Sequence, residues 1–207
     1  MKPNVTSFAK KCLGCIALLV GSIVIAAEAT ALPDPSKSIV NRDKYERIIK
    51  NKFPEFRILK TEDFDESVRS DVQDGVSGAL VIGNFDFDKN RDFAALLIGR
   101  IKTVARSYNI HDGEHSYNVY DGIFVLCHGN EKSNSYSCEK LGKADYNGSA
   151  YSTLSVIPPG RYECEFNDEG LKEVLTTIDG IGEYSEKAGG FRVLQKDGTY
   201  SSCADSD

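Results

Sequence analysis

The sequence lacks the local motifs that identify several common classes of enzyme. It has no Gly-x-Ser-x-Gly elbow for a serine nucleophile and no Gly-Lys-Ser/Thr loop for a nucleotide phosphate. Gly180-Ile181-Gly182 is without the third glycine of a dinucleotide-binding loop. Tryptophan is absent, so most of the 10 tyrosines and 10 phenylalanines are expected in the core instead of on an exposed sugar-binding platform. These absences favour a protein without enzymatic activity but do not decide the question, and a hydrolase that uses its abundant acidic residues is the alternative.

A basic cluster is also missing. Asp and Glu outnumber Lys and Arg by 31 to 25, which gives a net charge of -6. An acidic surface repels nucleic acid and anionic lipid, so neither is an expected partner.

The first 31 residues have the composition of a signal peptide. Three lysines open this segment, an apolar run from Cys12 to Ala27 follows, and Ala29-Thr30-Ala31 supplies a small-x-small cleavage pattern, with Ala29 as an alternative end. The competing interpretation is an uncleaved anchor, but the run is shorter than the roughly 20 residues that span a bilayer. We expect residues 32–207 to form one exported domain, periplasmic or secreted, with no stable insertion in the membrane.

Export changes the expected state of the cysteines. Four of the six follow the predicted leader, an even number in an oxidising compartment, where pairing is the default. Of the three possible connectivities we favour Cys127 with Cys138, which closes a short polar loop, and Cys164 with Cys203, which holds the C-terminal tail. No C-x-x-C pair follows the leader, so a zinc site of that type is not predicted.

The N-terminal part of the mature chain predicts one helix. An apolar stripe at helical spacing runs through residues 38–53, and Pro54 ends it. Residues 56–59 are typical of a short strand. The acidic residues of segment 61–78 indicate a surface loop with one helical turn at most. The stripe consists of Tyr45, Ile48 and Ile49.

Beyond Gly78 the pattern is that of strands. Asp121-Gly122 lies between two apolar segments and predicts a two-residue hairpin, as does Asp197-Gly198 after residues 191–194. Residues 171–178 fit a helix or a strand, and a strand is favoured. We therefore expect an α+β fold, in which an N-terminal helix packs on a mostly antiparallel, hairpin-rich β-sheet.

An oxygen-rich loop, residues 83–92, separates two apolar strand-like runs. Oxygen-bearing side chains alternate along it, so that several can point inwards, and calcium accepts six to eight oxygens at flexible angles. An EF-hand is excluded, because Lys89 and Ala95 stand where that loop needs Gly and a bidentate Glu. The alternative is an Asp-rich loop that binds nothing. The candidate calcium ligands are the side chains of Asn84, Asp86, Asp88 and Asp92 and the backbone carbonyl of Asn90.

The loop sequence, Gly83 to Leu97, resembles one calcium-loop unit of the FG-GAP/VCBS type known from β-propeller repeats. The resemblance implies the same five ligands, but it covers one unit of some twenty residues, so it does not imply a propeller fold. The family usually has Gly at the place of Lys89, which implies modest affinity. The C-terminal part, from Asp179 to Asp207, is also similar to exported bacterial proteins of uncharacterised activity that carry a single such loop.

One further motif, residues 111–115, matches the H-x-x-E-H pattern of an inverted zinc-protease site. That chemistry needs both histidines on one helix face, whereas Asp112-Gly113 favours a turn, so a loop is predicted instead. Adventitious metal binding by His111, His115 and His128 is a minor alternative.

Together these patterns predict an exported, disulfide-stabilised protein that binds one structural calcium ion and acts as a binding or interaction module. Its ligand would be a protein or a glycan that the sequence does not identify. An extracytoplasmic hydrolase and a secreted inhibitor or effector are the alternatives.

Overall fold

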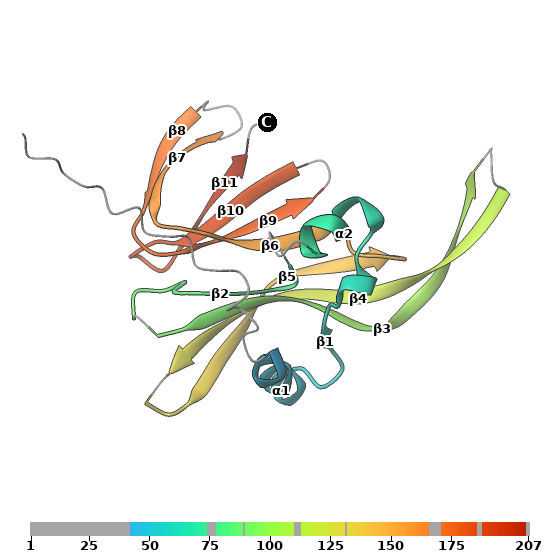
Figure 1. Cartoon of the computed structure of the whole chain (residues 1–207), viewed down its shortest axis with the longest axis horizontal. Helices are drawn as coiled ribbons and strands as arrows, with labels where there is room; N and C mark the ends of the chain where they lie inside the picture. Colours follow the sequence, from blue (N-terminus) through green and yellow to red (C-terminus); the bar gives the residue numbers. More distant parts are fainter. Residues whose placement is uncertain are drawn as a thin grey trace, which may run out of the picture. The chain divides into compact units, whose positions relative to one another are not determined.

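The computed structural model describes residues 42–73, 78–88, 90–109, 113–130, 132–165, 171–185 and 188–205. The predicted signal peptide and its cleavage site lie outside these residues. Within them the chain is mostly β, with eleven strands in two antiparallel sheets and little helix (Figure 1). The expected α+β class is therefore wrong, because strands make up most of the described residues and the helices are few and short. The helical elements are α1 (Arg42–Lys52), η2 (Thr61–Asp63) and α2 (Glu66–Gln73).

The first sheet has the order β1-β3-β4-β5, and β2 also pairs with β3. Its centre is the pair β3 and β4, in which residues 92–98 of β3 and residues 122–127 of β4 are buried on both faces and contribute a large share of the main hydrophobic core. The strands are β1 (Arg57–Ile58), β2 (Leu80–Gly83), β3 (Asp92–Asn109), β4 (Gly113–Asn130) and β5 (Ser135–Asn147).

The predicted hairpin at Asp121-Gly122 does not exist. Both residues lie inside the continuous strand β4, where Gly122 pairs with Ile98 on one side and Ala144 on the other. A Cβ on Gly122 would lie 2.5 Å from Cε2 of Tyr146, so glycine is needed here for close packing and not for a turn.

The second sheet has the order β6-β9-β10-β11-β7-β8 and is also antiparallel. A hairpin at Asp197-Gly198 is confirmed, since this segment joins β10 to β11 and Gly198 has a φ of 84°, but residues 195–199 connect the strands in place of the predicted two-residue turn. The strand favoured for residues 171–178 is confirmed as β8. The strands are β6 (Ser152–Ile157), β7 (Gly160–Glu165), β8 (Leu171–Thr176), β9 (Gly180–Ser185), β10 (Ala188–Leu194) and β11 (Tyr200–Asp205).

Helix α1 packs through its predicted apolar stripe. Tyr45 and Ile49 are buried, and the ring of Tyr45 lies 4.7 Å from that of Phe93 on β3. The acidic segment after β1 was expected to be a surface loop, but it folds into η2 and α2 and buries Phe64 and Val68 in the main core. Of its described acidic residues, Glu62, Glu66 and Asp71 are exposed to solvent, whereas Asp63 and Asp65 are partly buried.

The structure contains two disulfides, Cys127–Cys138 and Cys164–Cys203, which are the two pairs that the sequence favoured. The first joins directly opposed residues of β4 and β5, and the second joins β7 to β11 in the small core of the second sheet. Two disulfides indicate that the chain folds in an oxidising, extracytoplasmic environment. No described helix combines the length and the apolar character that crossing a bilayer requires.

Candidate metal centre

The oxygen-rich loop connects β2 to β3, whose ends are paired at Gly83 and Asp92. Its aspartates bond to the backbone two residues further on: Asp86 Oδ1 accepts from the N–H of Asp88 at 2.8 Å, and Asp88 Oδ1 accepts from the N–H of Asn90 at 2.7 Å. Two successive turns of this kind curl the loop, because each aspartate replaces a backbone acceptor. Lys89 itself lies outside the described residues.

Asp92 is the buried member of the site. Its side chain is 0% exposed, Oδ2 accepts from the N–H of Phe85 and Oδ1 accepts from the N–H of Gly129, both at 2.9 Å. Burial raises the pKa of Asp92, and the nearby Asp86 raises it further, while the two N–H groups act in the opposite direction. The carboxylate therefore holds the loop against β4.

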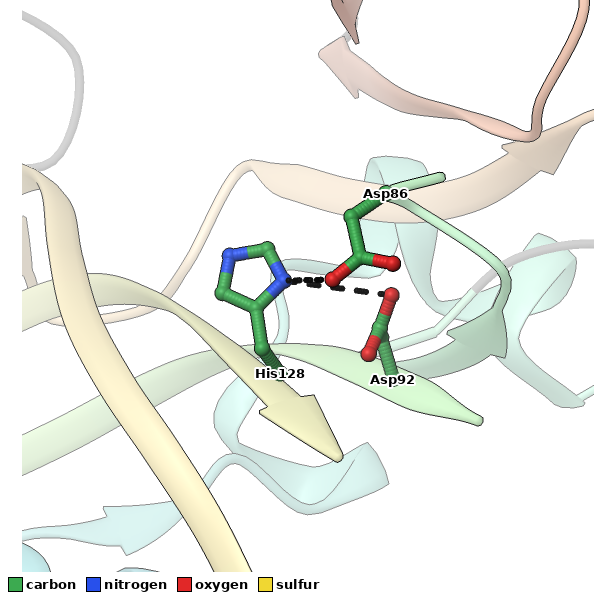
Figure 2. Close-up of side chains that lie close together, drawn as sticks. All are labelled: Asp86, Asp92 and His128. Carbon is green, nitrogen blue, oxygen red and sulfur yellow. Dashed lines mark hydrogen bonds and ion pairs between the residues drawn. The ribbon is translucent and has the colours of Figure 1, made fainter. Parts of the chain in front are cut away.

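Strand β4 adds a residue that the loop sequence does not contain, His128. Its Nδ1 lies 3.0 Å from Oδ2 of Asp86 and 3.9 Å from Oδ2 of Asp92. Figure 2 shows the three side chains pointing toward one another, Asp92 from β3, His128 from β4 and Asp86 from the loop. One ligand atom from each residue falls within 4.8 Å of the others. Oxygens that share one calcium ion at 2.3–2.6 Å lie at most about 5 Å apart, so this spacing fits a single cation.

Gly129 explains how β4 comes so close to the loop. A Cβ on this residue would collide with the backbone carbonyl oxygen of Arg91. Glycine therefore permits the approach that brings the N–H of Gly129 to Asp92 and the ring of His128 to Asp86.

The carboxylates of the loop are crowded. Partial burial raises the pKa of Asp86, and the neighbouring Asp88 raises it further. Desolvation also acts on Asp88, but hydrogen bonds, first that from the N–H of Asn90, lower its pKa below the usual value. Asp86 also raises the pKa of Asp92, so three carboxylates influence one another within one loop. A cation at their centre would remove this repulsion.

The remaining predicted ligands, Asn84 and Asn90, belong to the same loop but make their contacts elsewhere. The Nδ2 of Asn90 donates to the carboxylate of Asp88. Asn84 is tied to the loop before β9 by two hydrogen bonds: its N–H donates to Oδ2 of Asp179 at 2.8 Å, and its carbonyl accepts from the N–H of Asp179 at 3.1 Å. Its side-chain Oδ1 is buried and has no hydrogen-bond partner among the described residues. This oxygen is available to a ligand that the protein itself does not supply.

Sequence reasoning grouped the five loop residues but treated His128 only as an adventitious ligand. The structure brings Asp86 and Asp92 together with His128, and Asp88 adjoins them. The signal for His128 is the strand register, in which Phe93 lies opposite Cys127, so that the next residues along are Asp92 and His128. No local motif contains that information.

The H-x-x-E-H motif forms no zinc site in the described part of the chain. His115 is an exposed residue of strand β4 opposite Ser107, and Glu114 forms an ion pair with Arg106. His111 lies outside the described residues.

Comparisons with protein-family models, with curated proteins and with solved structures give no match to this chain. The resemblance to an FG-GAP/VCBS unit therefore stays a prediction that rests on the loop sequence.

Proposed function

We propose that this chain is an exported, disulfide-stabilised binding module that holds one calcium ion in the loop between β2 and β3. The observation that carries the proposal is the convergence of Asp86, Asp92 and His128, each with a ligand atom within 4.8 Å of the others. Asp88 adjoins the same group, and a buried oxygen of Asn84 is without a hydrogen-bond partner among the described residues.

Calcium is favoured by the donor set. Carboxylates, a side-chain amide oxygen and the carbonyl of Asn90 are all hard oxygen ligands, and flexible loops of this kind suit calcium better than magnesium. The nearby imidazole favours a second candidate, a first-row transition ion such as manganese or zinc, for which nitrogen is a good ligand. Replacing His128 by Gln distinguishes calcium from a transition ion. If calcium binds through oxygens, His128 only bonds to Asp86 and the variant retains most of the calcium affinity, whereas a transition ion bound through the imidazole would lose affinity.

The bound ion would be structural. It would join the loop to β4 through Asp92 and to the segment before β9 through Asn84, since both residues already bond to those elements. An extracellular calcium site has a dissociation constant of roughly 0.1–1 mM. At ten times that constant, bound calcium adds about 1.4 kcal/mol to the free energy of unfolding.

A hydrolase is less well supported. His128 and Asp86 have the geometry of the base and its orienting carboxylate in a nucleophilic enzyme. However, the other ring nitrogen, Nε2, lies 3.6 Å from Glu139, and Glu139 accepts a hydrogen bond from the hydroxyl of Tyr200. Cys127, the residue before His128, is bonded to Cys138 in a disulfide and therefore offers no nucleophile.

The proposal is tested by titrating metal-free protein with calcium, magnesium, manganese and zinc, following heat of binding and melting temperature. Wild-type protein should melt about 3–6 °C higher in calcium at ten times its dissociation constant than in chelator. Asp88→Ala should abolish this difference, because it removes a proposed calcium ligand. It should not unfold the protein, because the exposed carboxylate of Asp88 accepts its hydrogen bonds from Asn90 within the loop.

Asp197→Ala is the matched control. Asp197 makes the same kind of turn, accepting from the N–H of Thr199 at 3.0 Å, but it belongs to the β10–β11 connection. This variant should keep the calcium shift. The calcium proposal is wrong if wild-type protein shows neither heat of binding nor a melting shift with calcium, and binding of manganese or zinc alone would favour the second candidate.

A further inference from the structure

The strands β3 and β4 continue past the rest of the first sheet as a two-stranded ribbon, which we call the arm (residues 101–107 and 113–118). Figure 1 shows the arm in green and yellow-green, running beyond the end of β5. The last pair between β4 and β5 is Val119 with Asn147, and the last pair between β1 and β3 is Arg57 with Ile98. No described strand pairs with residues 101–107 on the outer edge of β3, and past Asn118, which accepts a hydrogen bond from Gly148, none pairs with the other edge of β4.

The arm is unusual in how little of it is buried. Each residue of β3 from Asp92 to Ile98 is buried, whereas none of the described arm residues is. Two of its apolar side chains are among the most exposed in the described chain, Ile101 at 51% and Val104 at 59%. A ribbon of two strands is marginally stable by itself in water, and a third strand on its edge is the usual remedy.

The outer edge of β3 has backbone groups ready for such a strand. The carbonyl of Asn118 accepts from the N–H of Gly148, on the β5 side, so Asn118 does not exchange hydrogen bonds with its partner Val104. The N–H and C=O of Val104 then point to the outer edge, and those of Arg106, two residues further on, do the same. Register shifts at Ile101 bend the strand just before this edge.

The charges on the arm indicate the kind of strand that fits. Within the arm, the β3 side carries Lys102 and Arg106 and the β4 side carries Glu114, and Arg100 lies immediately before the arm, so the outer strand of this part of an acidic protein is basic. Lys102 and Arg106 have ion-pair partners, Asp145 and Glu114, but all four side chains are more than half exposed and such pairs are weak. Two copies joined edge to edge would bring these cations together, which disfavours a second copy of this chain.

We infer that the outer edge of the arm, centred on Val104 and Arg106, binds an extended acidic segment of a partner protein as an added β-strand. Backbone hydrogen bonds would provide the affinity, alternate apolar residues of the segment would cover Val104 and Ile101, and its carboxylates would face the arm's cations. This inference goes beyond cation binding, because no residue of the arm belongs to the loop between β2 and β3.

The probe is a fluorescent, end-blocked nonapeptide in which glutamate alternates with valine, and its charge-inverted counterpart has lysine in place of glutamate. Fluorescence anisotropy should show saturable binding of the glutamate peptide and at least tenfold weaker binding of the lysine peptide. The affinities should be the same in calcium and in chelator, so that a failed cation proposal leaves this test intact.

Three variants locate the binding edge. Val104→Pro removes an outward N–H and should weaken binding of the glutamate peptide at least tenfold, whereas Val104→Thr keeps that N–H and should stay within about threefold of wild type. Arg106→Glu keeps the edge and inverts one charge, and it should also weaken the glutamate peptide. It serves as the decisive variant if circular dichroism shows Val104→Pro to be unfolded.

If folded Val104→Pro and Arg106→Glu bind the glutamate peptide as tightly as wild type, or if neither peptide shows saturable binding to wild type, the inference is overturned. A wild-type dimer in sedimentation that Val104→Pro converts to monomer would also overturn it, because the occupant would then be a second copy.

Discussion

Replacing Asp92 tests whether the buried carboxylate at the loop is a structural acceptor, a cation ligand or both. Asp92→Ala removes the acceptor for two buried N–H groups, those of Phe85 and Gly129. A buried donor left without a partner costs about 1–3 kcal/mol, so the variant should lose about 2–6 kcal/mol of unfolding free energy in chelator. Asp92→Asn retains one oxygen and removes the cost of burying a charge, which the raised pKa of Asp92 reflects. It should therefore lose less than the alanine variant.

Calcium separates the two roles. Asn is a neutral and weaker ligand than a carboxylate, so both variants should lose the 1.4 kcal/mol or so that calcium adds to wild type at ten times its dissociation constant. The assay is urea unfolding of wild type, Asp92→Ala, Asp92→Asn and the control Asp197→Asn, each with calcium and with chelator. Asp92 is not an important structural acceptor if Asp92→Ala lowers the unfolding free energy by under about 1 kcal/mol in chelator. Asp92 is not a cation ligand if either variant is stabilised by calcium as much as wild type is.

Two further predictions concern acid stability and the disulfides. Desolvation acts to raise the pKa of Asp63, but hydrogen bonds from Arg57 and from the N–H of Lys60 hold it below the usual value. The stabilisation that Asp63 provides should be present above about pH 4 and lost as pH falls through the lowered pKa. Asp63→Asn should therefore reduce the loss of unfolding free energy on the acid side of a plot of unfolding free energy against pH. Replacing the Cys164–Cys203 pair by alanines should lower stability by roughly 4 kcal/mol in the loop-entropy picture and leave calcium affinity unchanged, whereas replacing the Cys127–Cys138 pair should weaken calcium binding several-fold, as measured by calorimetry.

The elements that the sequence predicts well are those fixed by neighbouring residues. Helix α1 follows from an apolar stripe and Pro54, the β10–β11 turn follows from Asp197-Gly198, and the curled loop follows from aspartates two residues apart. In each case the signal and the structure lie within one short segment.

The sequence predictions are wrong where contacts with residues far away in the sequence determine the local structure. Asp121-Gly122 has the sequence of a turn, but strands on both sides pair with it and Tyr146 fills the space that a side chain would take. The acidic segment after β1 becomes helical because Phe64 and Val68 reach the main core. The α+β class was wrong because most of the described residues form strands, and the pairing of these strands into two sheets depends on contacts that local patterns do not encode.

The candidate site combines both kinds of information, and the Cys127–Cys138 disulfide links them. The loop supplies carboxylates by local pattern, but their convergence needs β4 to present His128 and the N–H of Gly129 at one position. The disulfide lies immediately before His128 and fixes the pairing of β4 with β5, which in turn brings Glu139 to within 3.6 Å of the second ring nitrogen. An oxidising compartment would thus do more than stabilise the chain. It would preorganise the strand on which the cation site depends, so the cost of ordering β4 is met before the ion arrives and less of the binding free energy is lost.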